Sequence, residues 1–98
     1  MKLTREQKET LNQRLAGVGE PLTYSTKHDE YIVKRGYFYT FGYNEDKLRV
    51  AVELSAKVAG IPINVTDTTN HWHAWPRDSW FEVRFRVLEP VTVQSDAR

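Results

Sequence analysis

The stretch NEDKLRVAVELSAKVAGIP, residues 44–62, contains the clearest helix pattern in the chain, and the rest of the fold can be arranged around it. Asn44 belongs to the residue types that cap a helix N-terminus, and the two acidic residues after it place negative charge at the positive end of the helix dipole. Gly60 can adopt the left-handed conformation that ends a helix, and Pro62 prevents continuation. The sequence therefore predicts a helix that begins after Asn44 and ends at Gly60.

This predicted helix has one broad apolar face that needs a partner. The face contains Leu48, Ala51, Val52, Ser55, Val58 and Ala59 and is widened by Leu54. Such a face is typical of a helix that packs on a sheet or on other helices. Val50 lies off this face, which indicates that the helix is buried on more than one side.

The strand best suited to cover this helix is WFEVRFRVL, residues 80–88, because its apolar and polar residues alternate. One of its surfaces consists of Phe81, Val83, Phe85 and Val87. We expect this surface to meet Leu48, Val52 and Leu54 of the helix. The opposite surface consists of Trp80, Glu82, Arg84 and Arg86. The candidates to cover this opposite surface are solvent, the first helix, a second copy of the protein or a partner.

A first helix precedes these elements. Thr4 and Gln7 have the spacing of a capping box at a helix start, and Gly17 can end the helix in the left-handed conformation. Leu11 and Leu15 fall on one face. Because the rest of the segment is polar, we expect this helix to lie on the surface, docked by its leucines.

Three further segments have the composition of strands. Residues 21–27 and 63–69 are rich in Thr, Val, Ile and Tyr, which favour strands. Residues 30–43, EYIVKRGYFYTFGY, are rich in aromatic and β-branched side chains. We expect Lys34, Arg35 and Gly36 to form a tight turn that divides this segment into a hairpin.

The predicted order of elements is α-β-β-α-β-β, in a single α+β domain over residues 1–94. We expect an antiparallel sheet of about four strands, with the second helix packed on one face and the N-terminal helix docked at the periphery. The 98 residues are enough for one domain with one modest core. Residues 95–98 belong to a polar tail that we expect to be disordered.

Charge and cysteine content narrow the classes of function. The chain has 14 Lys and Arg and 13 Asp and Glu, a net charge of +1, whereas proteins that wrap nucleic acid usually carry a larger basic excess. The absence of cysteine removes disulfides and thiol chemistry and suits a reducing compartment. With no signal-peptide pattern and no membrane-spanning apolar run, we expect a cytoplasmic protein. Small proteins of this composition are often encoded by phages or mobile elements, and on this general association alone we expect such an origin. No particular residue of this chain indicates it.

Aromatic, histidine and charged side chains are most concentrated in NHWHAWPRDSWFEVRF, residues 70–85, which contains all three tryptophans. Tryptophan and arginine dominate binding hot spots. We therefore expect a non-enzymatic protein-interaction module, a small inhibitor or adaptor, that binds a protein partner or associates with itself as a homodimer. The predicted contact residues are Trp72, Trp75, Arg77, Trp80, Arg84 and Arg86. An equally weighted alternative for Trp72 and Trp75 is that they fold back and close one end of the core.

A second hypothesis is single-stranded nucleic-acid binding on an aromatic and basic sheet face. Bases stack on aromatic side chains, while Lys and Arg meet the phosphates. The residues of this face would be Lys34, Arg35, Tyr37, Tyr39, Arg84 and Arg86. The small net charge and the interspersed acidic residues argue against this hypothesis.

A third hypothesis is an enzyme or metal site around His71 and His73. On a strand, these two imidazoles would point the same way and could bind one metal ion, with Asp67 or His28 as a third ligand. A structural zinc site needs four ligands, and the chain has no cysteine to supply them. The sequence lacks a nucleophile elbow and a phosphate-binding glycine loop, so we predict no catalytic residue and no cofactor.

Overall fold

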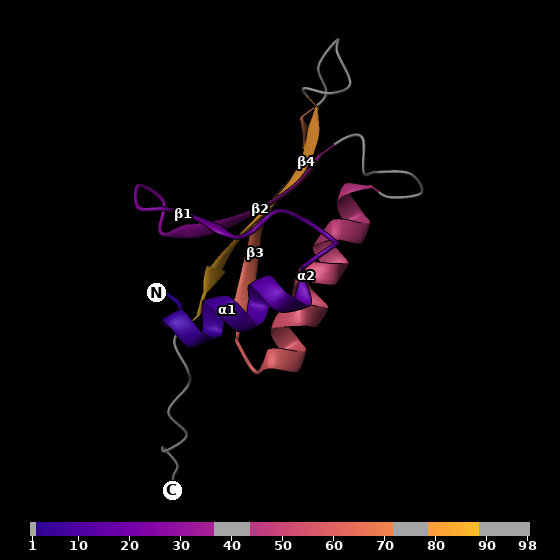
Figure 1. Cartoon of the computed structure of the whole chain (residues 1–98). Helices are drawn as coiled ribbons and strands as arrows, with labels where there is room; N and C mark the ends of the chain where they lie inside the picture. The colour runs from indigo at the N-terminus through magenta and orange to yellow at the C-terminus, as the bar shows by residue number, and fades with distance from the viewer. Residues whose placement is uncertain (1, 37–43, 72–78, 89–98) are drawn as a thin grey trace, which may run out of the picture.

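The computed structural model describes residues 2–36, 44–71 and 79–88, and its elements follow the order expected from the sequence (Figure 1). The helices are α1 (Arg5–Arg14) and α2 (Glu45–Ala59). The strands are β1 (Thr23–Ser25), β2 (Glu30–Gly36), β3 (Ile63–His71) and β4 (Trp80–Val87). This α-β-β-α-β-β order confirms the predicted α+β fold class. The predicted tail, residues 95–98, lies outside the described residues.

The strands form one antiparallel sheet in the order β1-β2-β4-β3, with β2 and β4 as the inner strands. Val33 of β2 lies opposite Val83 of β4, and Val65 of β3 lies opposite Phe85. An irregularity between Val65 and Asp67 shifts the register of β3. The predicted four-stranded antiparallel sheet is confirmed.

Helix α2 packs against β3 and β4, and both of its ends form as predicted. The Asn44 side chain accepts a hydrogen bond from the backbone N–H of Lys47, and Gly60 has a left-handed φ of 73°. The buried side chains of α2 are Leu48, Val52 and Ala56. They join the inward-facing residues of the sheet in one hydrophobic core, which includes Tyr31, Val33, Phe81, Val83, Phe85 and Val87.

The buried face of α2 is narrower than predicted. Leu54 and Val58 are 56% and 64% exposed, so the predicted contact between Leu54 and β4 is wrong. Val50 is also exposed, and α2 is therefore buried on one side only. The physical reason is helix periodicity: two positions turn the side chain through roughly 200°, so Leu54 points away when Val52 and Ala56 face the sheet.

Helix α1 lies on the same side of the sheet as α2 and docks through its leucines, as predicted (Figure 1). Thr4 and Gln7 form the capping box. Leu11 and Leu15 are almost fully buried, and Gly17 adopts the left-handed conformation in the turn that follows. Within the described residues, no helix is long and apolar enough to span a lipid bilayer.

Strand β2 runs straight through the predicted tight turn. Lys34 pairs with Glu82 and Gly36 pairs with Trp80, so the turn expected at Lys34, Arg35 and Gly36 is wrong. These residues have turn-forming types, but β4 is long enough to pair with β2 as far as Gly36, and this pairing outweighs the local turn preference. The second arm of the predicted hairpin, residues 37–43, lies outside the described residues.

Replacing Gly19 with alanine is expected to lower the free energy of unfolding by about 1–3 kcal/mol, because the new Cβ overpacks a tight contact. That Cβ would lie 2.9 Å from Val33 Cγ1 and 3.0 Å from the Lys34 carbonyl oxygen. Gly60→Ala is the control, because its Cβ would meet nothing within 4 Å and only backbone strain costs about 1 kcal/mol. Urea unfolding compares the variants, and a clearly smaller loss in Gly19→Ala contradicts the prediction.

Candidate functional site

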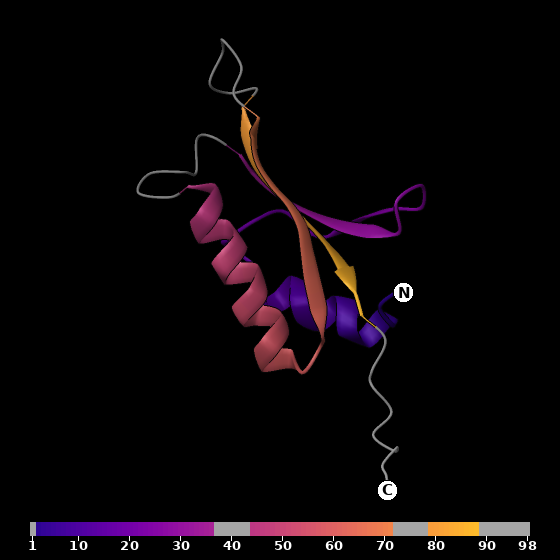
Figure 2. The ribbon, with the colours of Figure 1, turned by 180° about the vertical axis from the view of Figure 1, so that it is seen from behind.

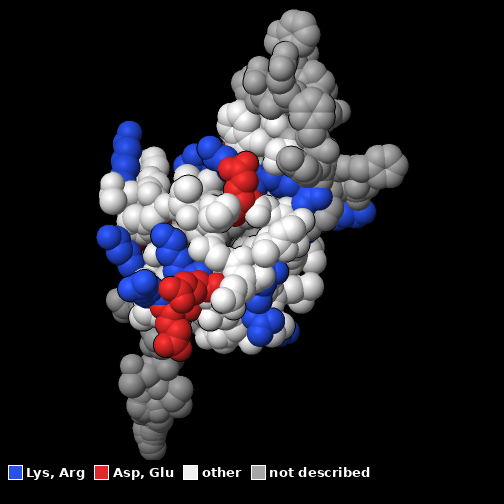
Figure 3. All heavy atoms as spheres, in the orientation of Figure 1, with Lys and Arg blue, Asp and Glu red and all other residues white. Residues whose placement is uncertain are grey.

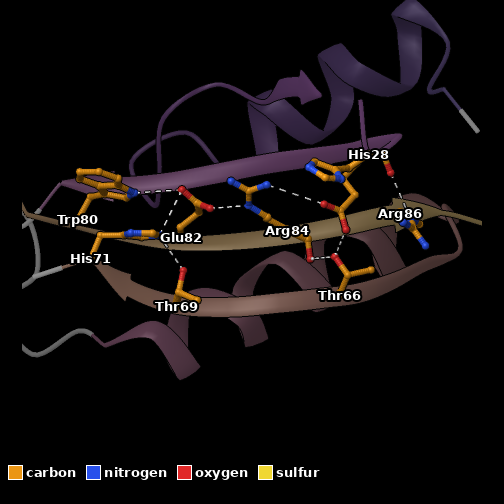
Figure 4. A network of polar contacts seen from close by, with 9 residues as sticks. His28, Thr66, Thr69, His71, Trp80, Glu82, Arg84 and Arg86 are labelled. Atoms are coloured by element: carbon orange, nitrogen blue, oxygen red, sulfur yellow. Dashed lines mark hydrogen bonds and ion pairs between the residues drawn. The ribbon is translucent and has the colours of Figure 1, made fainter. Parts of the chain in front are cut away.

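The sheet has a second face, on the side away from the core, and Figure 2 shows the ribbon from behind. A row of polar side chains lies along this second face (Figure 4). The alternation of side chains along β2, β3 and β4 decides which residues lie there. This open sheet face consists of Glu30, Ile32, Lys34, Asn64, Thr66, Asp67, Thr69, His71, Trp80, Glu82, Arg84 and Arg86. In Figure 4 the helices lie behind the strands that carry these side chains.

Glu82 is the most buried charged residue of the open sheet face, with only 3% of its surface exposed. Its carboxylate accepts hydrogen bonds from Trp80 Nε1 at 3.1 Å and from Arg84 Nε at 2.5 Å. His71 Nε2 lies 3.6 Å from the same carboxylate. Burial by itself raises the pKa of the Glu82 carboxyl, but these hydrogen bonds and the charge of Arg84 outweigh it and lower the pKa. Glu82 is therefore held in its ionised form.

Arg84 lies between two buried carboxylates. Besides its contact with Glu82, its Nη1 lies 3.9 Å from Glu30 Oε1, and Glu30 is 8% exposed. The Thr66 hydroxyl donates a hydrogen bond to the other carboxylate oxygen of Glu30. The hydrogen bond to Glu82, helped by the surrounding carboxylates, outweighs desolvation and raises the pKa of the Arg84 guanidinium. The positive charge of Arg84 is thus matched by acidic groups within the protein.

Trp80 is held in one position at the end of this network. Its ring stacks on His71, with centroids 4.6 Å apart and planes inclined by 15°. Lys34 Nζ lies 5.1 Å from the centroid of the same ring. His71 Nε2 is in turn 2.9 Å from the Thr69 hydroxyl. Contacts on the ring and on the indole N–H therefore fix a large, partly exposed aromatic side chain.

The formal charges of the open sheet face cancel. Its positive residues are Lys34, Arg84 and Arg86, and its negative residues are Glu30, Asp67 and Glu82. On the helix side, Figure 3 shows Lys and Arg side chains scattered over the surface instead of joined in one basic tract. Neither the balanced charges of the open sheet face nor the scattered Lys and Arg side chains in Figure 3 form the continuous positive surface that is typical of nucleic-acid-binding proteins.

The structure brings together three residues of the predicted protein contact. Trp80, Arg84 and Arg86 all project from the open sheet face, and Arg86 Nε donates a 3.4 Å hydrogen bond to the carbonyl oxygen of His28 (Figure 4). The other predicted contact residues, Trp72, Trp75 and Arg77, lie outside the described residues. The same holds for Tyr37, Tyr39 and His73.

Arg35 lies apart from the other described residues of the nucleic-acid hypothesis. It points to the helix side, whereas Lys34 points to the open sheet face, because neighbouring strand residues point in opposite directions. Arg35 Nη1 donates to the carbonyl oxygens of Gly17, at 3.1 Å, and Val18. Arg35 therefore ties β2 to the loop after α1.

The described histidines do not meet at a common site. His71 contacts Thr69 and Glu82, and His28 lies at the opposite end of the network in Figure 4. In the three described segments, no group of three or more His, Cys, Asp or Glu residues is arranged to hold a metal ion. The described residues therefore add no support to the metal hypothesis.

Sequence reasoning missed the network of buried carboxylates. Glu82 lies two residues from both Trp80 and Arg84, so their shared face is visible in the alternation, and their contacts could have been inferred. The contact between Glu30 and Thr66 joins residues 36 positions apart. It depends on the order of strands in the sheet, which no local pattern reveals.

Acid is expected to destabilise the protein in part through Glu82. The folded-state pKa of its carboxyl is below the ordinary value of 4.5. Ionised Glu82 therefore stabilises the fold above that value, and the contribution is lost as the pH falls through the lowered pKa. Glu82→Gln has no titrating carboxyl, so we expect a weaker dependence of its unfolding free energy on pH between about pH 5 and pH 2.

Urea unfolding at a series of pH values measures this difference. Glu9→Gln is the control, because Glu9 is an exposed carboxylate on α1 and should leave the pH profile close to that of the wild type. Identical profiles for the wild type and Glu82→Gln would show that the network does not hold Glu82 in its ionised form.

Comparison with known proteins supplies no relative from which a function could be transferred. No protein-family model, curated protein sequence or solved structure matches this chain significantly.

Proposed function

We propose that this chain is a non-enzymatic protein-interaction module, a small inhibitor or adaptor, that binds a partner protein through the open sheet face. The observation that carries this proposal is the fixed position of Trp80, stacked on His71, covered by Lys34 and bonded to Glu82. A preorganised tryptophan loses little conformational freedom on binding, and this residue type is enriched in interface hot spots.

The charge balance of the open sheet face supports a protein partner over a nucleic acid. Arg84 is already paired with Glu82 and lies near Glu30, so a phosphate approaching it would also meet two carboxylates. Nucleic-acid binding draws its affinity mainly from unmatched Lys and Arg charges. A partner protein with mixed charges fits this face better.

The ionisation of Glu82 supports binding over acid–base catalysis. A general acid or base works best with a pKa close to the working pH, which for a carboxyl requires a raised pKa. The pKa of Glu82 is instead lowered, and both carboxylate oxygens accept hydrogen bonds. This carboxylate is suited to holding Trp80 and Arg84 in position.

The test is a peptide-display selection on the immobilised protein, followed by titration of the enriched peptides. We expect the double variant Lys34→Glu, Arg86→Glu to bind them at least about tenfold more weakly than the wild type. The matched control is Lys8→Glu, Arg14→Glu, which makes the same charge change at two exposed positions of α1 and should bind as the wild type does. Peptides that bind the wild type and the open-face variant equally would contradict the proposal.

A parallel titration with mixed-sequence single-stranded DNA and RNA tests the nucleic-acid alternative. We expect no saturable change in tryptophan fluorescence at low salt. Saturable quenching that weakens as salt increases, and that the open-face variant loses, would support nucleic-acid binding over the proposed function.

A further inference from the structure

Helix α2 carries a strip of exposed apolar side chains on the side opposite the core. Val50, Leu54 and Val58 are 44%, 56% and 64% exposed and follow one another at intervals of four residues. Single exposed apolar residues are ordinary on protein surfaces. Here, three of the four large exposed hydrophobic residues in the described segments lie on one line, Leu88 being the fourth. We call these three residues the α2 strip.

The α2 strip is complementary to itself. Leu54 lies at its centre, with one valine a helical turn before it and one a turn after it. If a second copy of α2 ran antiparallel across the strip, Leu54 would meet Leu54 of that copy. Val50 of each chain would meet Val58 of the other. The two ends of the strip therefore match without any change in the fold.

The charges beside the α2 strip favour the antiparallel arrangement. Glu53 and Lys57 flank the strip on the same side of the helix, and Glu53 also pairs with Arg49 of its own chain at 2.9 Å. In an antiparallel pair related by a twofold axis, Glu53 of each chain lies next to Lys57 of the other, which makes two attractive pairs. A parallel arrangement would instead place the flank with Glu53 and Lys57 against the flank with Ala51 and Ser55 of the other chain, where neither charge gains a partner. On the other flank, the small residues Ala51 and Ser55 let the helices approach closely.

We propose that the α2 strip is a self-association surface and that its occupant is α2 of a second copy of this chain, in antiparallel orientation. The strip contributes three apolar side chains per chain, so the dimer is weak and forms as the protein concentration rises. Because α2 lies between the strip and the sheet, pairing through the strip leaves both open sheet faces uncovered and directed away from each other. A dimer of this kind would present two copies of the proposed binding face.

Sedimentation velocity over about 10 µM to 1 mM protein tests this proposal. We expect the wild type to shift from monomer toward twice the monomer mass within this range, and Leu54→Glu to remain a monomer throughout. Leu54 is exposed, so this variant is expected to fold, which circular dichroism checks. Leu88→Glu is the matched control, because it adds the same charge at an exposed leucine outside the strip and should dimerise like the wild type.

A charge swap tests the antiparallel orientation. Lys57→Glu is expected to weaken the dimer about tenfold by placing like charges beside each other, and adding Glu53→Lys is expected to restore it. A wild type that stays monomeric at the highest concentration would overturn the proposal. So would a dimer that Leu54→Glu leaves intact, because it would use a different surface. Neither outcome bears on peptide binding at the open sheet face, so the two proposals fail separately.

Discussion

Replacing Arg84 with methionine is expected to lower the free energy of unfolding by about 2–4 kcal/mol, because it leaves two buried carboxylates without their cation. Glu82 and Glu30 are 3% and 8% exposed, and both lie within ion-pair distance of Arg84. Methionine keeps much of the aliphatic volume of the arginine stem, so the loss reports mainly on charge. Urea unfolding at neutral pH measures it.

An exposed ion pair supplies the control for this prediction. Arg5 and Glu9 form a 3.4 Å pair on α1 in which the side chains are 94% and 62% exposed. Exposed pairs contribute little, so Arg5→Met is expected to change the free energy of unfolding by less than about 0.5 kcal/mol. If Arg84→Met costs no more than Arg5→Met, the carboxylates of the open sheet face do not depend on Arg84.

A double-mutant cycle separates the ion pair from other effects of removing Arg84. With Glu82→Leu already in place, one of the two carboxylates is gone and Arg84→Met is expected to cost clearly less than it does in the wild type. A coupling energy of about 1–2 kcal/mol between the two positions would be consistent with direct contact. Strict additivity would place the effect of Arg84 elsewhere in the network.

The parts of the fold that local patterns specify could be predicted from the sequence. Asn44 and Gly60 delimit α2 because capping and the left-handed conformation depend on residues within one turn. The alternation along β4 placed Trp80, Arg84 and Arg86 on one face for the same reason. In each case the physical cause lies within a few residues of the position that it explains.

The parts that depend on distant segments could not be predicted. Lys34 and Gly36 have turn composition, but they extend β2 because β4 is beside them. The burial of Glu30 depends on Thr66 and Arg84, which reach it only when β2, β4 and β3 lie side by side. The alternation along β4 predicted the shared face of Trp80, Arg84 and Arg86, but no local pattern reveals the contacts that hold them in position.

The second large loss of unfolding free energy is expected in helix α2, which contains two leucines in very different surroundings. Leu48 is fully buried, whereas Leu54 is 56% exposed. Leu48→Ala is expected to lower the free energy of unfolding by about 2–5 kcal/mol, because it removes transfer energy and leaves a cavity among residues that cannot fully collapse. Leu54→Ala deletes the same atoms from an exposed site and is expected to change it by less than about 0.5 kcal/mol.

Measured by urea unfolding at low micromolar concentration, the two variants decide which side of α2 faces the sheet. Both substitutions exchange leucine for alanine within one helix, so differences in helix propensity nearly cancel. A large loss in Leu48→Ala alone would confirm that the core consists of Leu48, Val52 and Ala56. Comparable losses in both variants would mean that Leu54 is also buried in solution. At low concentration the proposed dimer is dissociated, so that result would place Leu54 in the core and remove the basis for the α2 strip.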